Sequence, residues 1–436
     1  FVYLTFQPQC SIIFTLFRPR EIPGRWTNIH YFFPKGKHMN NTLLLMLSVM
    51  MFMEYAIWGA WSPVLASRLL GPLKMTGKQT GWIYGTIPLA SIIAPLFAGQ
   101  IADRWVATQW ILLVAHAIGG LLLFVAARRK TFGPLFGVMG LYALCYASTI
   151  PLVNSLMFVQ LEKHYANAEE VNTTSTFIFL WAPVAWVLAG WALTGWRMKK
   201  GTGDGSDCLI LAGILSLIMA VFCVFLPDTP PQGVPGAALP FIKAFDMLSE
   251  TNFLIFIILS LIVTTQIWFY YLGTAPYLQD IGVQSKNIPA VMSIAQIAQT
   301  LFTLFAFGYC LKNYGFRWIL GGGAFCWLVM YLIYSLQKPK PLVIGSMALH
   351  GIAYVLFMIG GQVYVNTVAP ADIKSSAQAL DIVVTVGLGS FLGTQITGVV
   401  MDRLKVQDKF RWRTIFLVPC LLTLLCVAAF LLFFKG

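Results

Sequence analysis

Apolar segments of about twenty residues recur along almost the whole chain, separated by short polar breaks. A helix of that length crosses a hydrocarbon core of about 30 Å. Inside lipid each segment must also satisfy its own backbone hydrogen bonds, which a helix does. We therefore predict an all-α membrane protein with about twelve transmembrane helices, at residues 41–67, 79–102, 109–127, 134–160, 172–196, 207–226, 251–278, 288–310, 318–337, 342–367, 376–400 and 412–434.

The composition agrees with a bilayer as the main solvent. Of the 436 residues, 58% are hydrophobic and only 10% are charged, which is too little polar surface for a soluble protein of this size. The net charge of +13 would suggest nucleic acid as the partner of a soluble domain. Here the positive residues stand singly or in small groups between the spans, so we interpret them as loop residues and expect no nucleic-acid binding.

The longest internal polar stretch divides the predicted spans into two sets of six. Four prolines and two glycines between Pro227 and Gly236 exclude a continuous helix. The following run with Lys243 and Asp246 indicates a short helix at the membrane surface. We predict a first six-helix bundle at 39–226, a linker at 227–250 and a second bundle at 251–436.

Residues 1–38 contain one short apolar run, Ile12–Phe17, which is too brief to span a membrane. Met39 opens the first span. We therefore expect residues 1–38 to be an N-terminal extension that is disordered or belongs to a mis-assigned start.

Ionisable residues inside the spans are candidates for function, because such groups are costly in hydrocarbon. Glu54 lies about 20 Å along the first span, near the middle of the bilayer. Trp58 and Trp61 follow at i+4 and i+7, on the same helical face. An acid beside two indoles suits a proton-coupled site for a flat polar ring; the alternative is a packing contact with a neighbouring helix.

Three further ionisable residues lie within predicted spans. His350 shares a helical face with Tyr354, which leaves both a ligand-binding and a packing interpretation open. His116 is interpreted as a contact between helices. Asp381 is either a second proton-coupling candidate or a residue at the membrane interface.

Span eight carries a regular polar stripe of Ser293, Gln296, Gln299, Thr300 and Thr303. In span seven, Gln266 and Tyr270 form a similar amide and aromatic face. Side-chain amides offer donors and acceptors that match the edge of a nucleobase or the hydroxyls of a ribose. Hydrogen bonding between helices is the alternative.

Nothing in the sequence indicates catalysis, a cofactor or a metal site. The eight cysteines are scattered without a Cys-x-x-Cys pair, and there is no His-Glu-x-x-His, Walker loop or Gly-x-Ser-x-Gly. We expect no enzyme activity.

Several short runs resemble the nucleoside:proton symporters of the major facilitator superfamily. They are Trp58-Gly59-Ala60-Trp61, the run from Gly99 to Trp105, His116-Ala117-Ile118-Gly119, Met292-Ser293-Ile294-Ala295-Gln296 and Ser376-Ala377-Gln378. The resemblance implies two six-helix bundles around a central cavity and alternating access in a bacterial inner membrane. It also implies that Gln296, Gln266 and Tyr354 contact nucleoside and that Asp103 and Arg104 belong to a cytoplasmic gating loop.

The chain departs from that family at polar positions. Phe179 stands where an Arg is expected, Gln299 where an acid is common and Val355 where an Asp is expected. Glu54 is our hypothesis for the replacement proton carrier. The alternatives are an uncoupled facilitator for sugars or other small polar solutes and a non-transporting membrane sensor.

The loop charges disagree with the orientation that the resemblance implies. With the N-terminus in the cytoplasm, the inner loops from Met39 onward hold seven of the 24 Lys and Arg residues. Positive-inside counting opposes this orientation, and only the resemblance favours it.

Overall fold

The computed structural model describes residues 41–231, 240–370 and 373–435. The predicted extension at 1–38 and the middle of the linker lie outside these ranges. The regular secondary structure of the described ranges is helical apart from one short hairpin, β1 (Lys405–Val406) and β2 (Lys409–Phe410), which the sequence did not predict.

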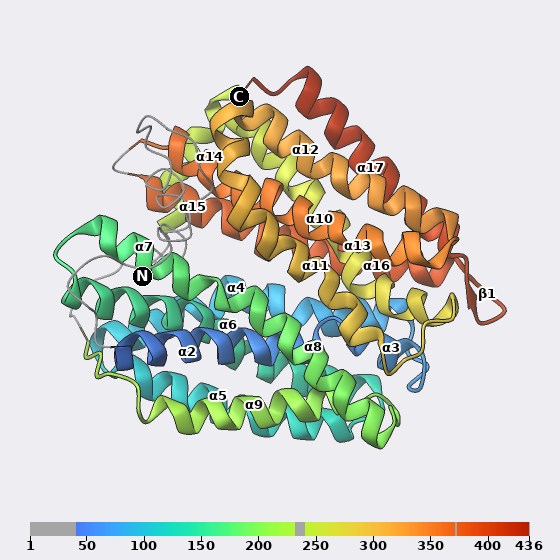
Figure 1. Ribbon diagram of the computed structural model, residues 1–436, viewed down its shortest axis with the longest axis horizontal. Coiled ribbons are helices and arrows are strands. Elements are labelled where there is room, and N and C mark those ends of the chain that lie inside the picture. The colour runs from blue at the N-terminus through green and yellow to red at the C-terminus, as the bar shows by residue number, and fades with distance from the viewer. Residues whose placement is uncertain (1–40, 232–239, 371–372, 436) are drawn as a thin grey trace, which may run out of the picture.

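Helices α2 to α9 occupy the lower part of Figure 1, and we call them the first half. Their bounds are α2 (Asn41–Trp61), α3 (Leu65–Leu70), α4 (Gly77–Arg104), α5 (Thr108–Arg128), α6 (Phe132–His164), α7 (Ala168–Phe179), α8 (Trp181–Lys200) and α9 (Asp207–Cys223).

The second half, from η3 to α17, occupies the upper part of Figure 1. It begins with a 3-10 helix, η3, which confirms the short helix predicted in the linker, and contains three π-helical turns, η4 to η6. The bounds are η3 (Pro240–Ser249), α10 (Thr251–Asp280), α11 (Ile288–Phe302), η4 (Thr303–Phe307), α12 (Gly308–Leu336), α13 (Lys340–Tyr354), η5 (Val355–Ile359), α14 (Gly360–Val368), α15 (Lys374–Ile382), η6 (Val383–Gly389), α16 (Ser390–Arg403) and α17 (Trp412–Leu432).

The predicted number of spans is confirmed. Ten helical runs in the described ranges are long and apolar enough to cross a membrane. One of them, 49 residues from Ile288 to Leu336, is broken at Gly315, where φ is 62° and ψ is 163°, and so contains two spans. The apolar helix α9, with 17 residues, adds the twelfth.

Two predicted spans are interrupted by proline. The first ends at Trp61 and resumes as α3 beyond Pro63, and the fifth breaks at Leu180 before Pro183. Proline lacks an N–H and crowds the preceding turn, so neither run continues as a single α-helix.

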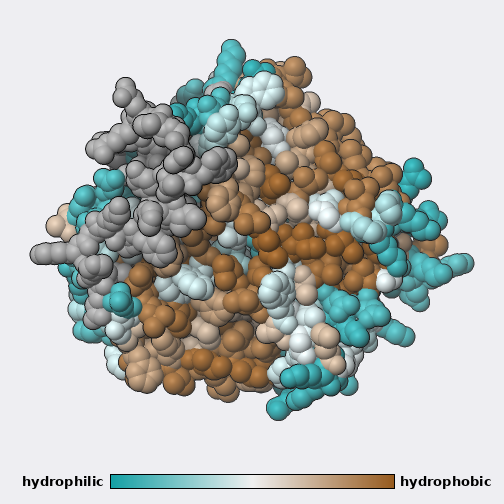
Figure 2. Space-filling model, in the orientation of Figure 1, coloured by the Kyte–Doolittle hydropathy of each residue, from teal (hydrophilic) through white to brown (hydrophobic). Residues whose placement is uncertain are grey.

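The outer surface of the helices is apolar. Large hydrophobic side chains such as Leu121, Phe97, Phe305 and Leu425 are more than half exposed. Figure 2 shows apolar residues over the middle of the visible face and polar residues toward its ends, including the β1–β2 hairpin. This distribution suits a protein surrounded by lipid.

The two halves meet along a seam where α4 packs against α16 and α8 packs against α11. We name the end of the molecule that carries α3 and the β1–β2 hairpin the hairpin side, and the end with α7, α14 and α15 the linker side (Figure 1).

Candidate functional site

Glu54 lies inside the first half and is completely buried. Its Oε1 accepts a hydrogen bond of 2.6 Å from the Thr149 hydroxyl on α6, and its Oε2 lies 3.0 Å from Nε2 of His116 on α5. The hydroxyl of Tyr146 donates to the Glu54 backbone carbonyl at 2.8 Å. The acid therefore interacts with an imidazole and a hydroxyl, not with the two indoles that the helical spacing suggested.

The two tryptophans of α2 lie in different environments. Trp61 is 1% exposed and donates to the Tyr142 hydroxyl, so its indole is packed within the first half. Trp58 is partly buried and reaches the seam, where its ring packs against Trp186 at 5.6 Å between centroids.

Gln296 lies at the seam, beside a small pocket that has room for about one water molecule. Residues of α2, α8 and α11 and of the turn after α2 line this pocket, among them Gly59, Pro63, Trp186, Pro289, Ser293 and Gln296. The polar stripe of α11 thus faces the first half at its hairpin-side end. Gln299, three residues further along, is partly exposed.

Gln266, Tyr270 and His350 form a second polar cluster, within the second half. The rings of Tyr270 and His350 stack at 3.7 Å between centroids. Trp327 Nε1 donates to His350 Nδ1 at 3.0 Å, which leaves Nε2 as the nitrogen that carries the proton of the neutral imidazole. Gln266 is completely buried, and neither of its amide atoms has a hydrogen-bond partner among the described residues.

Aromatic rings connect this cluster to the first half across the seam. Trp186 contacts Tyr271 at 6.4 Å, and Tyr271 contacts His350 at 5.7 Å. Tyr354, which is partly exposed, lies near Tyr271. Tyr271 and Trp327 were not selected from the sequence, where they look like ordinary apolar packing residues.

Asp381 lies apart from both groups, on α15 near the linker side. It is 4% exposed, and its Oδ1 has no hydrogen-bond partner in the described ranges. The side chain is therefore enclosed by the protein. Its neighbour Gln378 donates to the Gln362 carbonyl at 2.7 Å, which joins α15 to α14.

Asp103 and Arg104 end α4 on the linker side. Asp103 is 4% exposed while Arg104 is exposed. Phe179 and Val355, which stand at positions where the resembling family carries charge, are both buried among apolar side chains.

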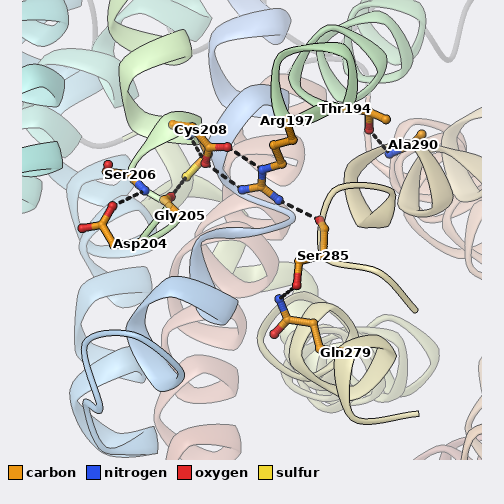
Figure 3. A network of polar contacts seen from close by, with 10 residues as sticks. Thr194, Arg197, Asp204, Gly205, Ser206, Cys208, Gln279, Ser285 and Ala290 are labelled. Carbon is orange, nitrogen blue, oxygen red and sulfur yellow. Dashed lines mark hydrogen bonds and ion pairs between the residues drawn. The ribbon is translucent and has the colours of Figure 1, made fainter. Parts of the chain in front are cut away.

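On the hairpin side the two halves are held together by polar contacts (Figure 3). Arg197 of α8 makes a two-pronged ion pair with Asp207, and its Nη1 donates to the Ser285 carbonyl at 3.2 Å in the loop before α11. The Thr194 hydroxyl accepts from the Ala290 backbone N–H at 3.0 Å. Asp402 of α16 accepts from the first two backbone N–H groups of α4.

Asp204, in the loop between α8 and α9, illustrates the electrostatics of this side. Partial burial alone would raise its pKa, but hydrogen bonds from Ser206 and the nearby guanidinium of Arg68 outweigh burial and lower it. The carboxylate therefore stays ionised to a lower pH than an ordinary aspartate and remains paired with Arg68, 3.5 Å away.

Comparisons with known proteins agree with this architecture. The model of the family described as nucleoside H+ symporter matches residues 39–436. The putative nucleoside transporter YegT of Escherichia coli is 29% identical over 407 residues, covering 89% of this chain and 93% of that protein. The nucleoside permease NupG of Escherichia coli is 25% identical over 416 residues, covering 90% and 96%.

Two crystal structures show the same fold. The nucleoside transporter NupG matches with a TM-score of 0.81 at 24% identity, over 91% of this chain and 100% of that chain. A D-xylose–proton symporter matches with a TM-score of 0.69 at 14% identity, over 91% and 97%. The protein is therefore a multi-pass membrane transporter with the major facilitator fold, not an enzyme. Within that class, it belongs to the nucleoside H+ symporter family.

Proposed function

We propose that this protein imports nucleosides together with protons across a bacterial cytoplasmic membrane. Residues 39–226 and 251–436 act as two six-helix bundles joined by the linker at 227–250, and the substrate site alternates between the two sides as the bundles rock. The family match and the nucleoside transporters among its relatives support this proposal.

The unpaired amide of Gln266 is the observation that carries the substrate assignment. A buried polar group without a partner costs about 1–3 kcal/mol, and Gln266 has both an unpaired donor and an unpaired acceptor. A nucleobase edge or a ribose can supply both partners. Completion by a ligand is one reason for which native proteins keep such groups.

The remaining substrate contacts come from residues around the seam. His350 would offer an N–H donor from Nε2, since Trp327 occupies Nδ1. The stacked ring of Tyr270 supports the imidazole from one face. The other contacts that we propose are Gln296, Gln299, Tyr354 and Trp58.

The orientation that we propose has the N-terminus in the cytoplasm. The hairpin side then faces outward, and the contacts of Arg197 and Asp402 close the protein to the outside. Asp103 and Arg104 lie in the cytoplasmic loop between the second and third spans, where they would act in gating. The proton carrier is one of three buried ionisable residues, Glu54, Asp381 and His350.

Uptake by the full-length protein in proteoliposomes tests the proposal. Radiolabelled adenosine, uridine and inosine are offered with and without a pH gradient that is acidic outside. We expect accumulation above equilibrium only with the gradient. Equal final uptake with and without the gradient would indicate an uncoupled facilitator, for which xylose counterflow is the next assay. Binding without flux would indicate a membrane sensor.

A further inference from the structure

We propose that Glu54, together with Thr149 and His116, forms the proton-binding site of this transporter. The inference rests on the proposed function and selects one of the three candidate carriers named there. The site lies in the first half, away from the Gln266 cluster, so that proton and substrate occupy different places.

The position of Thr149 lets Glu54 exist in two protonation states. The Thr149 hydroxyl oxygen lies 2.6 Å from Glu54 Oε1 and 2.7 Å from the Tyr146 carbonyl oxygen. A hydroxyl has one hydrogen to donate and two lone pairs to accept with. When Glu54 is ionised, Thr149 donates to it. When Glu54 is protonated, the acid donates to Thr149, whose own hydrogen turns to the Tyr146 carbonyl.

An ionisable imidazole, that of His116, lies beside the Glu54 carboxylate. Its Nε2 lies 3.0 Å from Glu54 Oε2, and both side chains are at most 1% exposed. The contact does not have the geometry of a hydrogen bond, so its contribution is mainly electrostatic. An ionised Glu54 beside a neutral His116 carries a net charge of −1. Binding one proton brings the pair to zero, the less costly charge in a buried site.

The other titratable groups near the pair do not change this charge balance. Those that interact electrostatically with Glu54 are Tyr55 on α2, Tyr142 and Tyr146 on α6, and Cys223 on α9. Phenols and thiols are neutral at pH 7. On α8, which also packs against α2, the rings that contact α2 on either side of Glu54 are Trp181 and Trp186, and neither titrates. One proton on the pair therefore sets the local charge.

The proton site is connected to the seam through rings. Tyr146 donates to the Glu54 backbone, and its ring packs against Trp58 at 6.1 Å between centroids. Trp58 contacts Trp186, which in turn contacts Tyr271 of the second half. These contacts form the route by which a change of hydrogen bonding at Thr149 would reach the proposed substrate contacts.

The two rival carriers lack this arrangement. Protonation of His350 at Nδ1 would break its bond from Trp327, because an indole N–H can only donate. Near Asp381, the hydroxyl of Thr385 donates to the Asp381 backbone, and no hydroxyl bonds the carboxylate in the described ranges.

The test uses the full-length protein in proteoliposomes with labelled uridine, adenosine and inosine. In Glu54→Gln, we expect gradient-driven accumulation to fall to the equilibrium level while counterflow stays within twofold of wild type. In Thr149→Val, ionised Glu54 loses its donor and holds the proton more tightly. The midpoint of the pH dependence of uptake should then move to higher pH by about one unit.

Ser148→Ala is the matched control, because the Ser148 hydroxyl bonds only carbonyls of its own helix. It should leave the midpoint unchanged. The inference would be overturned if Glu54→Gln kept full dependence on the gradient. It would also be overturned if Asp381→Asn, and not Glu54→Gln, lost that dependence. If Glu54→Gln does not fold, an unshifted midpoint in Thr149→Val overturns it.

A second readout separates this inference from the proposed function. Tryptophan fluorescence is titrated against pH without substrate. We expect a transition in wild type that is absent in Glu54→Gln, since Trp58 contacts Tyr146. A transition together with no nucleoside transport would contradict the proposed function and keep the proton site. No difference between the two titrations would contradict the proton site.

Discussion

Gln266 and Gln109 are both buried amides with opposite surroundings. Gln109 donates to Asp228 at 2.6 Å and accepts from the Thr229 backbone N–H at 3.1 Å. Gln266 has neither kind of bond in the described ranges. One amide therefore stabilises the fold, whereas the other costs stability while it is unpaired, and in the proposed function a nucleoside pairs it.

Gln266→Leu should raise the stability of the substrate-free protein by about 1–3 kcal/mol, because an unpaired buried amide is removed. The same change should weaken nucleoside binding at least tenfold, which corresponds to about 1.4 kcal/mol. Thermal unfolding in detergent and equilibrium binding of labelled nucleoside measure the two effects. Gln109→Leu is the control and should only destabilise. Wild-type affinity in Gln266→Leu would contradict the substrate assignment.

The sequence singled out Glu54 but not its partners. Helical spacing relates residues of one helix, so it pointed to Trp58 and Trp61. His116 and Thr149 come from α5 and α6, 62 and 95 positions further along the chain. A buried acid implies a donor on some neighbouring helix, and only the packing of the helices decides which one.

Helix α13 contains two glycines in contrasting environments. A Cβ added to Gly351 would lie 1.9 Å from the Ala295 carbonyl oxygen of α11, whereas a Cβ at Gly345 meets nothing within 4 Å. Gly351 therefore sets how closely α13 and α11 approach, and with it the position of the polar stripe on α11.

Gly351→Ala should force α11 and α13 apart and destabilise the protein by about 1–3 kcal/mol. Gly345→Ala should be neutral or stabilising by up to about 1 kcal/mol, because alanine is the better helix former. Thermal unfolding of both variants measures the difference. Equal stability of the two would show that α11 yields to the added methyl group.

Hydropathy predicted where helices occur, and local backbone chemistry determined where they break. The spans agree within a few residues for most helices, because the bilayer fixes their length. The π-helical turns η4, η5 and η6 had no sequence signal. They lie within apolar runs, where hydropathy does not distinguish a π-helical turn from an α-helical one.

At the scale of the whole molecule, Asp402 joins the two halves on the hairpin side. Its carboxylate caps the N-terminus of α4, and its Oδ2 accepts from the Lys78 N–H at 2.9 Å. The helix dipole and two charge-assisted bonds make this a favourable contact. In the proposed alternating access, this contact must break when the hairpin side opens.

Asp402→Ala should therefore increase the population that is open on the hairpin side by about tenfold, as expected for the loss of about 1.4 kcal/mol. Spin labels at the exposed residues Lys130 and Lys286, one in each half, report the change as a longer distance. Asp408→Asn is the control, since that carboxylate is 97% exposed and pairs with Lys405 beside it. Identical distance distributions in wild type and Asp402→Ala would contradict this gating role.

Both ends of the 227–250 segment are anchored, one to each half. Asp228 and Thr229 are bonded to Gln109 and Gln160 of the first half, while η3 packs on α15 and α10 of the second. Only residues 230–239 remain to bridge these anchors, and a fully extended chain of that length reaches about 35 Å. A connecting segment of this length is compatible with the proposed tilting of one bundle against the other. Its extended length is an upper limit on the distance between the two anchored ends.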